Sequence, residues 1–187
     1  VCIYHRRIFI TIFITSFIIF SAVHQASANS VVRALESELS NCAPELCESG
    51  WYNNTVALED QWLFKVYQNL SYQPLWVAKD RVKGEGRVLL KNLLTADIQG
   101  LVPADYNTDK IESLIDSVQP DQLARLDIAL TKGFLRYAYD LSVGRNAARQ
   151  AFPGLFPEAG EDLFDPNLLI SQLKLADNLQ DYLRSLG

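Results

Sequence analysis

The most restrictive feature of the sequence is a regular stripe of large apolar residues between positions 121 and 144. Its six members recur at spacings of three and four: Leu123, Leu126, Leu130, Phe134, Tyr137 and Leu141. That spacing places them on one face of an α-helix. Pro120 and Asp121 precede the stripe and Gly144 closes it, which is the usual punctuation of a helix. So regular a stripe is typical of a buried face, so the sequence predicts a long helix that faces the core.

Shorter segments carry the same periodicity and predict further helices. They are residues 30–40, 55–70, 88–98, 109–118, and a C-terminal segment from 167 onward that is broken near Asp177. No segment after residue 28 alternates apolar and polar residues as a half-buried strand does. We therefore expect an all-α fold: a compact bundle of about five to seven short helices with a Pro/Gly/Phe-rich loop, preceded by a signal-peptide helix.

Prolines and glycines predict where several of these helices begin and end. The residue before Pro74 favours extended backbone, so residues 72–77 should leave the second helix and lie across the bundle. Residues 79–86 are charged and contain two glycines, which predicts a loop. Asp165 followed by Pro166 predicts a capped start for the C-terminal helix.

A further break follows segment 88–98, whose expected core face comprises Val88, Leu89, Leu93, Ala96 and Ile98. Gly100 can adopt the left-handed conformation just past a helix end, and Leu101 can then pack back on the last turn. Pro103 prevents the helix from resuming. Tyr106 should be a buried ring whose hydroxyl needs a hydrogen-bond partner.

The N-terminal segment has the parts of a targeting sequence. Residues 8–23 contain no charged side chain, follow two arginines, and lead to the tripeptide Ala-Ser-Ala that ends at position 28. We expect residues 1–28 to be a secretory signal peptide, cleaved after Ala28. The alternative is a retained membrane anchor, although a full span usually takes about 20 apolar residues. With either interpretation the rest of the chain is exported.

Without this leader the chain is acidic. Two of its 17 basic side chains leave with the leader, so 15 remain against 22 acidic ones, a formal net charge of −7. That charge argues against nucleic acid and anionic lipid as partners. Cys42 and Cys47 remain in a linker that completes the N-terminal region 29–54, and in an oxidising compartment such a pair is most simply a disulfide. A zinc site there would lack ligands, because both histidines lie in the leader.

The absence of histidine after residue 28 also restricts catalysis. Cys–His pairs and Ser–His–Asp triads are excluded, and we expect no cofactor. A pair of carboxylates remains possible, as in glycoside hydrolysis, and the candidates are Glu158, Glu161, Asp162 and Asp165. The alternative is a solvated acidic loop that ends in a helix cap.

Six aromatic residues also allow two interpretations: Trp51, Tyr52, Trp62, Tyr67, Tyr72 and Trp76. Their rings could line a sugar-binding groove. More often, such residues are anchors of a core or an interface.

Three segments occur in a recognisable order: YQPLW at 72–76, TADIQGLVPADY at 95–106 and LTKGFLRYAYDLSVGR at 130–145. Together they resemble the scaffold domain of the large, multidomain L,D-transpeptidases of Gram-negative bacteria. The resemblance covers residues 56–145 well and the C-terminal helices more loosely. The motif positions that it marks as structural are Tyr72, Pro74, Trp76, Ala96, Gly100, Leu101, Pro103, Tyr106, Thr131, Tyr137, Asp140, Gly144 and Arg145. One position departs from the pattern, since Leu70 stands where the family commonly has an arginine.

The resemblance implies a periplasmic protein that acts on peptidoglycan through a separate catalytic domain. In that family a cysteine nucleophile, with a histidine, forms cross-links between diaminopimelate residues. This catalytic signature has no counterpart here, so no catalytic residue is carried over to the chain. The resemblance divides the exported part beyond the linker into a scaffold-like helical domain at 55–146 and the loop and C-terminal helices of the same scaffold at 147–187.

We therefore expect the non-catalytic scaffold of such a transpeptidase, truncated before its catalytic domain, either as a gene product or as an incomplete sequence. Its expected partner is peptidoglycan or a catalytic L,D-transpeptidase domain, with a membrane involved only if the N-terminal segment is retained. One alternative is a stand-alone periplasmic adaptor that binds peptidoglycan or a protein through exposed aromatic residues. Another is a carboxylate-based muralytic enzyme. With the scaffold interpretation, we expect the corner at Gly100 to determine the fold and not to be part of an active site.

Overall fold

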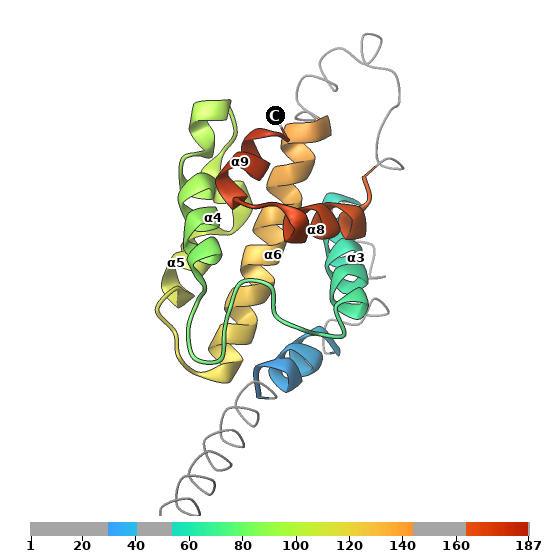
Figure 1. Ribbon diagram of the computed structural model, residues 1–187, viewed down its shortest axis with the longest axis vertical. Coiled ribbons are helices and arrows are strands. Elements are labelled where there is room, and N and C mark those ends of the chain that lie inside the picture. The colour runs from blue at the N-terminus through green and yellow to red at the C-terminus, as the bar shows by residue number, and fades with distance from the viewer. Residues whose placement is uncertain (1–29, 41–53, 144–163, 187) are drawn as a thin grey trace, which may run out of the picture.

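A helix of 24 residues, α6 (Pro120–Val143), forms the centre of the molecule (Figure 1). The computed structural model of the protein describes residues 30–40, 54–143 and 164–186. The other elements, in chain order, are a helix over residues 30–40, α3 (Asn54–Asn69), α4 (Gly84–Leu94), the 3₁₀ turns η1 (Ala96–Gln99) and η2 (Pro103–Tyr106), α5 (Thr108–Leu114), α8 (Pro166–Leu175) and α9 (Leu179–Arg184).

The helices pack around α6 on two sides. α4 and α5 contact one side of α6, and α3, which also contacts α8, packs on the other (Figure 1). Within the described ranges the one strand-like pairing is an isolated bridge between Val77 and Val82. The predicted all-α fold is confirmed, with seven α-helices in the part of the chain that the structure describes. No helix in these ranges is long and apolar enough to cross a membrane.

The predicted stripe on α6 provides the centre of the core. The side chains of Leu123, Leu126, Leu130 and Phe134 have no exposed surface, and Tyr137 retains 2%. Leu141 is partly buried at the far end of the helix. Trp76 packs edge-on against Phe134 with ring centroids 5.5 Å apart, so the segment that carries Trp76 is part of the same core.

Residues 72–77 leave the helical structure, as predicted, and the chain crosses from α3 to α4 (Figure 1). The turn begins at Ser71 and Tyr72, which both have positive φ angles of 50° and 56°. The backbone N–H of Tyr72 donates to the carbonyl of Tyr67 in the last turns of α3. This turn directs Trp76 and Val77 towards α6, where both are buried.

The predicted loop at 79–86 is wrong in its last three residues, because α4 already begins at Gly84. Gly86 is buried in the first turn of this helix. A Cβ atom at Gly86 would lie 2.6 Å from Cγ2 of Val82 and 3.2 Å from the carbonyl oxygen of Trp76. The glycine therefore permits close packing inside a helix, and it does not mark a flexible loop.

The helix that leads to Gly100 also differs from the prediction. α4 ends at Leu94, and the 3₁₀ turn η1 follows it. A 3₁₀ helix has fewer residues per turn than an α-helix, so Ile98 is rotated away from the core and is 82% exposed. Val88, at 37% exposure, was also wrongly assigned to the core face. The end itself is as predicted: Gly100 has a φ of 74°, and Leu101 is buried.

The C-terminal helices begin at side-chain caps. Asp165 accepts hydrogen bonds from the N–H groups of Asn167 (2.9 Å) and Leu168 (3.3 Å), which confirms the predicted cap of α8. The predicted break near Asp177 is also confirmed, and the side chain of Asn178 caps α9. α5 ends at Leu114, four residues before its predicted end.

Candidate functional site

The carboxylate of Asp127 on α6 is fully buried and accepts four hydrogen bonds. One oxygen accepts from the hydroxyl of Tyr67 and from the N–H of Leu75 at 3.1 Å. The other oxygen accepts from the N–H groups of Trp76 at 2.7 Å and Val77 at 3.0 Å. A single carboxylate thus satisfies three successive backbone donors that no helix or sheet could satisfy at this crossing.

The hydroxyl of Thr131 lies beside that of Tyr67 and completes this cluster. Thr131, one turn after Asp127, donates to the carbonyl of Asp127 at 2.8 Å and accepts from the indole N–H of Trp76 at 3.1 Å. Burial, followed by the charge of Asp127, raises the pKa of Tyr67 well above its ordinary value. The Tyr67 hydroxyl therefore keeps its proton and remains a donor. Burial also raises the pKa of Asp127, and the four hydrogen bonds that its carboxylate accepts act in the opposite direction.

A second buried cluster joins the Gly100 corner to α6. The hydroxyl of Tyr106 donates to Oδ2 of Asp140 at 3.0 Å, and the same oxygen accepts from Nε of Arg136 at 3.0 Å. Arg136 also donates to Glu59 on α3 at 2.7 Å. The partner that Tyr106 was expected to need is therefore Asp140, another position of the family motif. This cluster links η2, α6 and α3.

The corner packs closely on α6 at Gly133. A Cβ atom there would lie 2.8 Å from the carbonyl oxygen of Tyr106 and 2.9 Å from Cδ1 of Leu93. The rings of Tyr106 and Tyr137 meet edge-to-face with centroids 5.5 Å apart, and the Tyr137 hydroxyl donates to Gln99. The second and third motif segments therefore form one packed unit.

These contacts show what the described motif residues do. Trp76 donates to Thr131, Tyr106 donates to Asp140, and Tyr137 donates to Gln99. Ala96 and Leu101 are buried apolar residues. Pro74 and Tyr72 belong to the crossing segment, and Pro103 begins η2. Gly144 and Arg145 lie outside the described residues. The described part of the motif builds the fold and presents no reactive array.

The predicted carboxylate site is only partly placed. Glu158, Glu161 and Asp162 lie outside the described residues, as do Cys42 and Cys47 of the predicted disulfide. Asp165 is described, and its carboxylate is exposed and caps α8. For Asp165, the structure therefore agrees with the alternative of a helix cap.

The described tryptophans of the predicted aromatic groove are buried in the core. Trp62, Tyr67 and Trp76 are buried, with at most 4% of their surface exposed. The indole of Trp62 packs against the rings of Tyr139 and Phe164, with centroids 5.2 and 4.5 Å away. Tyr72 is half-buried, whereas Trp51 and Tyr52 lie outside the described residues. The described tryptophans are therefore core anchors.

An open cleft of about 630 Å³ lies on the surface between the start of α4 and the connection from α8 to α9. Leu75 and Lys83 form one wall, and Nζ of Lys83 donates to the carbonyl of Leu75 at 2.7 Å. Gln180 forms part of the opposite wall, where its amide exchanges two hydrogen bonds with Asn92 of α4 at 2.9 and 3.0 Å. These bonds hold α9 against α4, so the wall is fixed by side-chain contacts.

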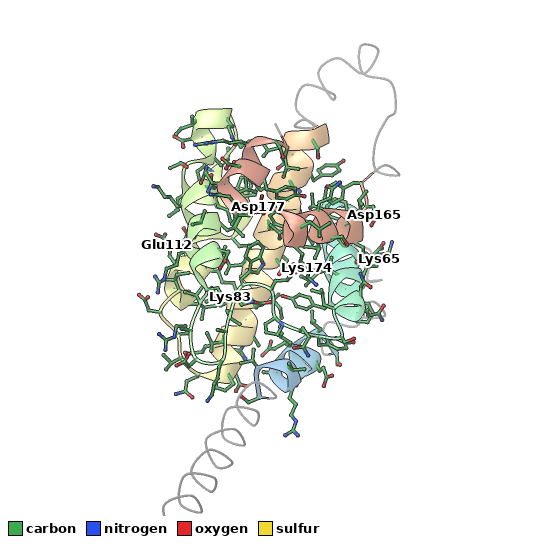
Figure 2. All side chains as sticks on the ribbon, in the orientation of Figure 1. Lys65, Lys83, Glu112, Asp165, Lys174 and Asp177 are labelled. Carbon is green, nitrogen blue, oxygen red and sulfur yellow. The ribbon has the colours of Figure 1, made fainter. Side chains whose placement is uncertain are left out.

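Four charged side chains line this cleft: Lys83, Glu85, Lys174 and Asp177. Figure 2 labels Lys83, which lies just before α4, and Lys174 and Asp177, which lie at the end of α8 and just after it. The charges balance, and the apolar side chains of Leu75, Val88 and Leu173 line the same space. Such a surface suits a ligand with both charges and an apolar part.

Sequence reasoning missed Asp127 and the cleft. Asp127 lies four residues after Leu123 and three before Leu130, inside the stripe assigned to the core. A charged residue at such a position must have buried partners, and this signal could have identified it. The cleft had no comparable signal, because its walls come from segments about 90 residues apart in the chain.

No histidine occurs after residue 28. Among the described residues no group of three or more His, Cys, Asp and Glu side chains is arranged to hold a metal ion.

In a comparison with protein families, a family model described as Scaffold domain matches residues 61–187. The match includes all three motif segments and the C-terminal helices α8 and α9. No curated protein and no solved structure matches the chain.

Proposed function

We propose, since the chain belongs to the Scaffold domain family, that it is the non-catalytic scaffold of a periplasmic peptidoglycan L,D-transpeptidase. The observation that carries the proposal is the buried carboxylate of Asp127, which fixes the YQPLW segment to α6. It supports the proposal because these hydrogen bonds hold one motif segment against the central helix. A helical body held together in this way can position other parts of an enzyme and needs no reactive group of its own.

The residue types of the chain support the assignment of catalysis to a separate domain. Peptide cross-linking by a cysteine requires a thiolate and a base, commonly histidine. The exported part has Cys42 and Cys47 but no histidine. The nucleophile and its base would therefore be supplied by a separate catalytic domain, and the helical body would support that domain or orient its substrate.

The test is reconstitution of activity from separate parts. We would incubate muropeptides with the purified chain, with the catalytic domain of a scaffold-containing L,D-transpeptidase, and with both. We expect no turnover by the chain alone and a higher rate for the mixture than for the catalytic domain alone. A chain with both cysteines alkylated should stimulate equally well, because its thiols have no catalytic role. Turnover by the chain alone, or no stimulation, would contradict the proposal.

A second candidate function is favoured by the cleft at α4 and α9: a periplasmic adaptor that binds peptidoglycan without a catalytic partner. Isolated sacculi should then retain the purified chain, and excess soluble muropeptide should release it. The scaffold function alone requires no such retention, so this experiment separates the two functions. The exposed aromatic surface first expected for an adaptor does not include Trp62 or Trp76, which are buried.

A further inference from the structure

The cleft between α4 and the α8–α9 connection has the size and rigidity of a ligand site. Its volume of about 630 Å³ lies within the range of roughly 300–1,000 Å³ that is common for small-molecule sites. Both walls are fixed by hydrogen bonds, from Lys83 to Leu75 on one side and between Asn92 and Gln180 on the other. Little ordering of these walls would be needed on binding.

The charges in this cleft remain available to a ligand. Lys174 lies in the last turn of α8, and Asp177 follows in the connection to α9. Both side chains are exposed, and in the described part of the chain neither takes part in an ion pair. Glu85 is likewise exposed and unpaired there. Lys83 uses its ammonium group on the carbonyls of Leu75 and Pro74 and still contributes positive charge.

The mixture of signs selects among ligand classes. An anionic nucleotide or lipid head group would gain no net attraction, because Glu85 and Asp177 offset the two lysines of the cleft. A neutral sugar usually stacks on an exposed aromatic face, but Trp76, the aromatic residue in the lining, is 2% exposed. A short peptide with free termini offers a carboxylate for the lysines and an ammonium for the acids. Its side chains can also contact Leu75, Val88 and Leu173.

We propose that this cleft binds short zwitterionic peptides, with Lys174 and Asp177 as the charges that select for the two free ends. The inference goes beyond the adaptor function proposed above and does not depend on it. It differs from that function in one respect, since it assigns binding to one cleft and to the charged ends of a peptide.

The experiment is a titration of the purified chain with tetra-alanine, followed by two-dimensional NMR. Two further probes have one charge removed: N-acetyl-tetra-alanine and tetra-alanine amide. We expect saturable shifts at residues of the cleft with the free peptide, and binding weakened about two- to fivefold by each blocked end. Exposed charge pairs contribute modestly, so a change of this size is expected. No saturable shift with tetra-alanine, or equal binding of all three probes, would overturn the proposal.

Charge reversal in the protein gives the second arm. Lys174→Glu and Asp177→Lys should each weaken tetra-alanine binding about two- to fivefold or more. Lys65→Glu on α3 and Glu112→Lys on α5 change the net charge identically, are exposed, and lie outside the cleft, so they should leave binding unchanged (Figure 2). Equal losses in the cleft variants and in these controls would show a nonspecific charge effect and overturn the proposal.

Sacculus binding distinguishes failure of this inference from failure of the adaptor function. If sacculi retain the chain while tetra-alanine gives no saturable shift, the adaptor function stands and the peptide site is wrong. If tetra-alanine binds in the cleft while sacculi do not retain the chain, the peptide site stands and the adaptor function is wrong.

Discussion

The carboxylate of Asp127 accepts a hydrogen bond of 2.7 Å from the backbone N–H of Trp76, 51 positions earlier in the chain. The same oxygen accepts from Val77, and Leu75 donates to the other oxygen. In the described part of the chain these three N–H groups have no other hydrogen-bond acceptor. The position of the crossing segment therefore depends on this one side chain. The relationship explains why a segment without regular structure is buried across the centre of a helical bundle.

Replacing Asp127 by asparagine should therefore destabilise the fold strongly. An amide keeps one acceptor oxygen, and its NH₂ group would face two of the present donors. Leaving buried donors unsatisfied costs about 1–3 kcal/mol each, so we expect a loss of roughly 2–5 kcal/mol in the free energy of unfolding. Urea denaturation measures this loss.

Asp116→Asn is the matched control for that substitution. Asp116 pairs with Arg87 at 2.8 Å, but both side chains are more than half exposed. An exposed pair contributes at most about 1 kcal/mol. Equal losses in the two variants would show that the buried carboxylate is not the anchor of the crossing segment.

The sequence predicts the elements whose signals are local. The stripe on α6, the left-handed Gly100 and the Asp165 cap each depend on residues within a few positions of one another. All three are present in the structure. The need of Tyr106 for a buried partner also follows from its residue type, although its partner, Asp140, lies 34 positions away.

Features that depend on contacts between distant segments were not predicted. Glycine is typical of loops, but Gly86 lies in a helix, where its lack of a side chain allows Trp76 and Val82 to pack closely against it. In the sequence, Ile98 continues the α-helical periodicity, but it lies in the 3₁₀ turn η1 and therefore does not share the core face. The partners of Asp127 and the walls of the cleft likewise appear only once the helices have packed.

Two glycines in helices offer a paired test of close packing. Gly133→Ala would place a Cβ atom 2.8 Å from the carbonyl oxygen of Tyr106, so we expect a destabilisation of about 1–3 kcal/mol. Gly84→Ala meets nothing within 4 Å and should be neutral or stabilising by up to about 1 kcal/mol. Thermal or urea unfolding would measure both. A neutral Gly133→Ala variant would mean that η2 does not pack on α6 at this distance.

The bond between Tyr106 and Asp140 can be isolated by a double-mutant cycle. Tyr106→Phe removes one donor to Asp140 and leaves that of Arg136, so we expect a loss of about 1–2 kcal/mol. Combined with Asp140→Ala, which leaves no side-chain acceptor, the two losses should not add, because both changes remove the Tyr106–Asp140 hydrogen bond. Tyr72→Phe serves as a control on a half-buried ring and should change stability little. Strictly additive losses would show that the two residues act independently.

Alkaline unfolding should depend on Tyr67. Burial, followed by the charge of Asp127, raises its pKa in the folded protein well above the value of about 10 for an unfolded chain. The folded state therefore favours the protonated hydroxyl, and this contribution to stability is complete below about pH 10 and is lost as the pH rises further. Urea denaturation at increasing pH should show falling stability above that point, and Tyr67→Phe should show a shallower fall.

The absorbance of ionised tyrosine supplies the independent measurement for this prediction. Burial also raises the pKa of Tyr137 and Tyr182, so these two side chains act in the same direction, and their contribution remains in Tyr67→Phe. In the unchanged chain, part of the phenolate signal should appear only together with the loss of helical circular dichroism. In Tyr67→Phe that coupled part should be smaller. Complete ionisation of all tyrosines while the helices persist would show that Tyr67 is accessible to base in the folded protein, which contradicts its burial against Asp127.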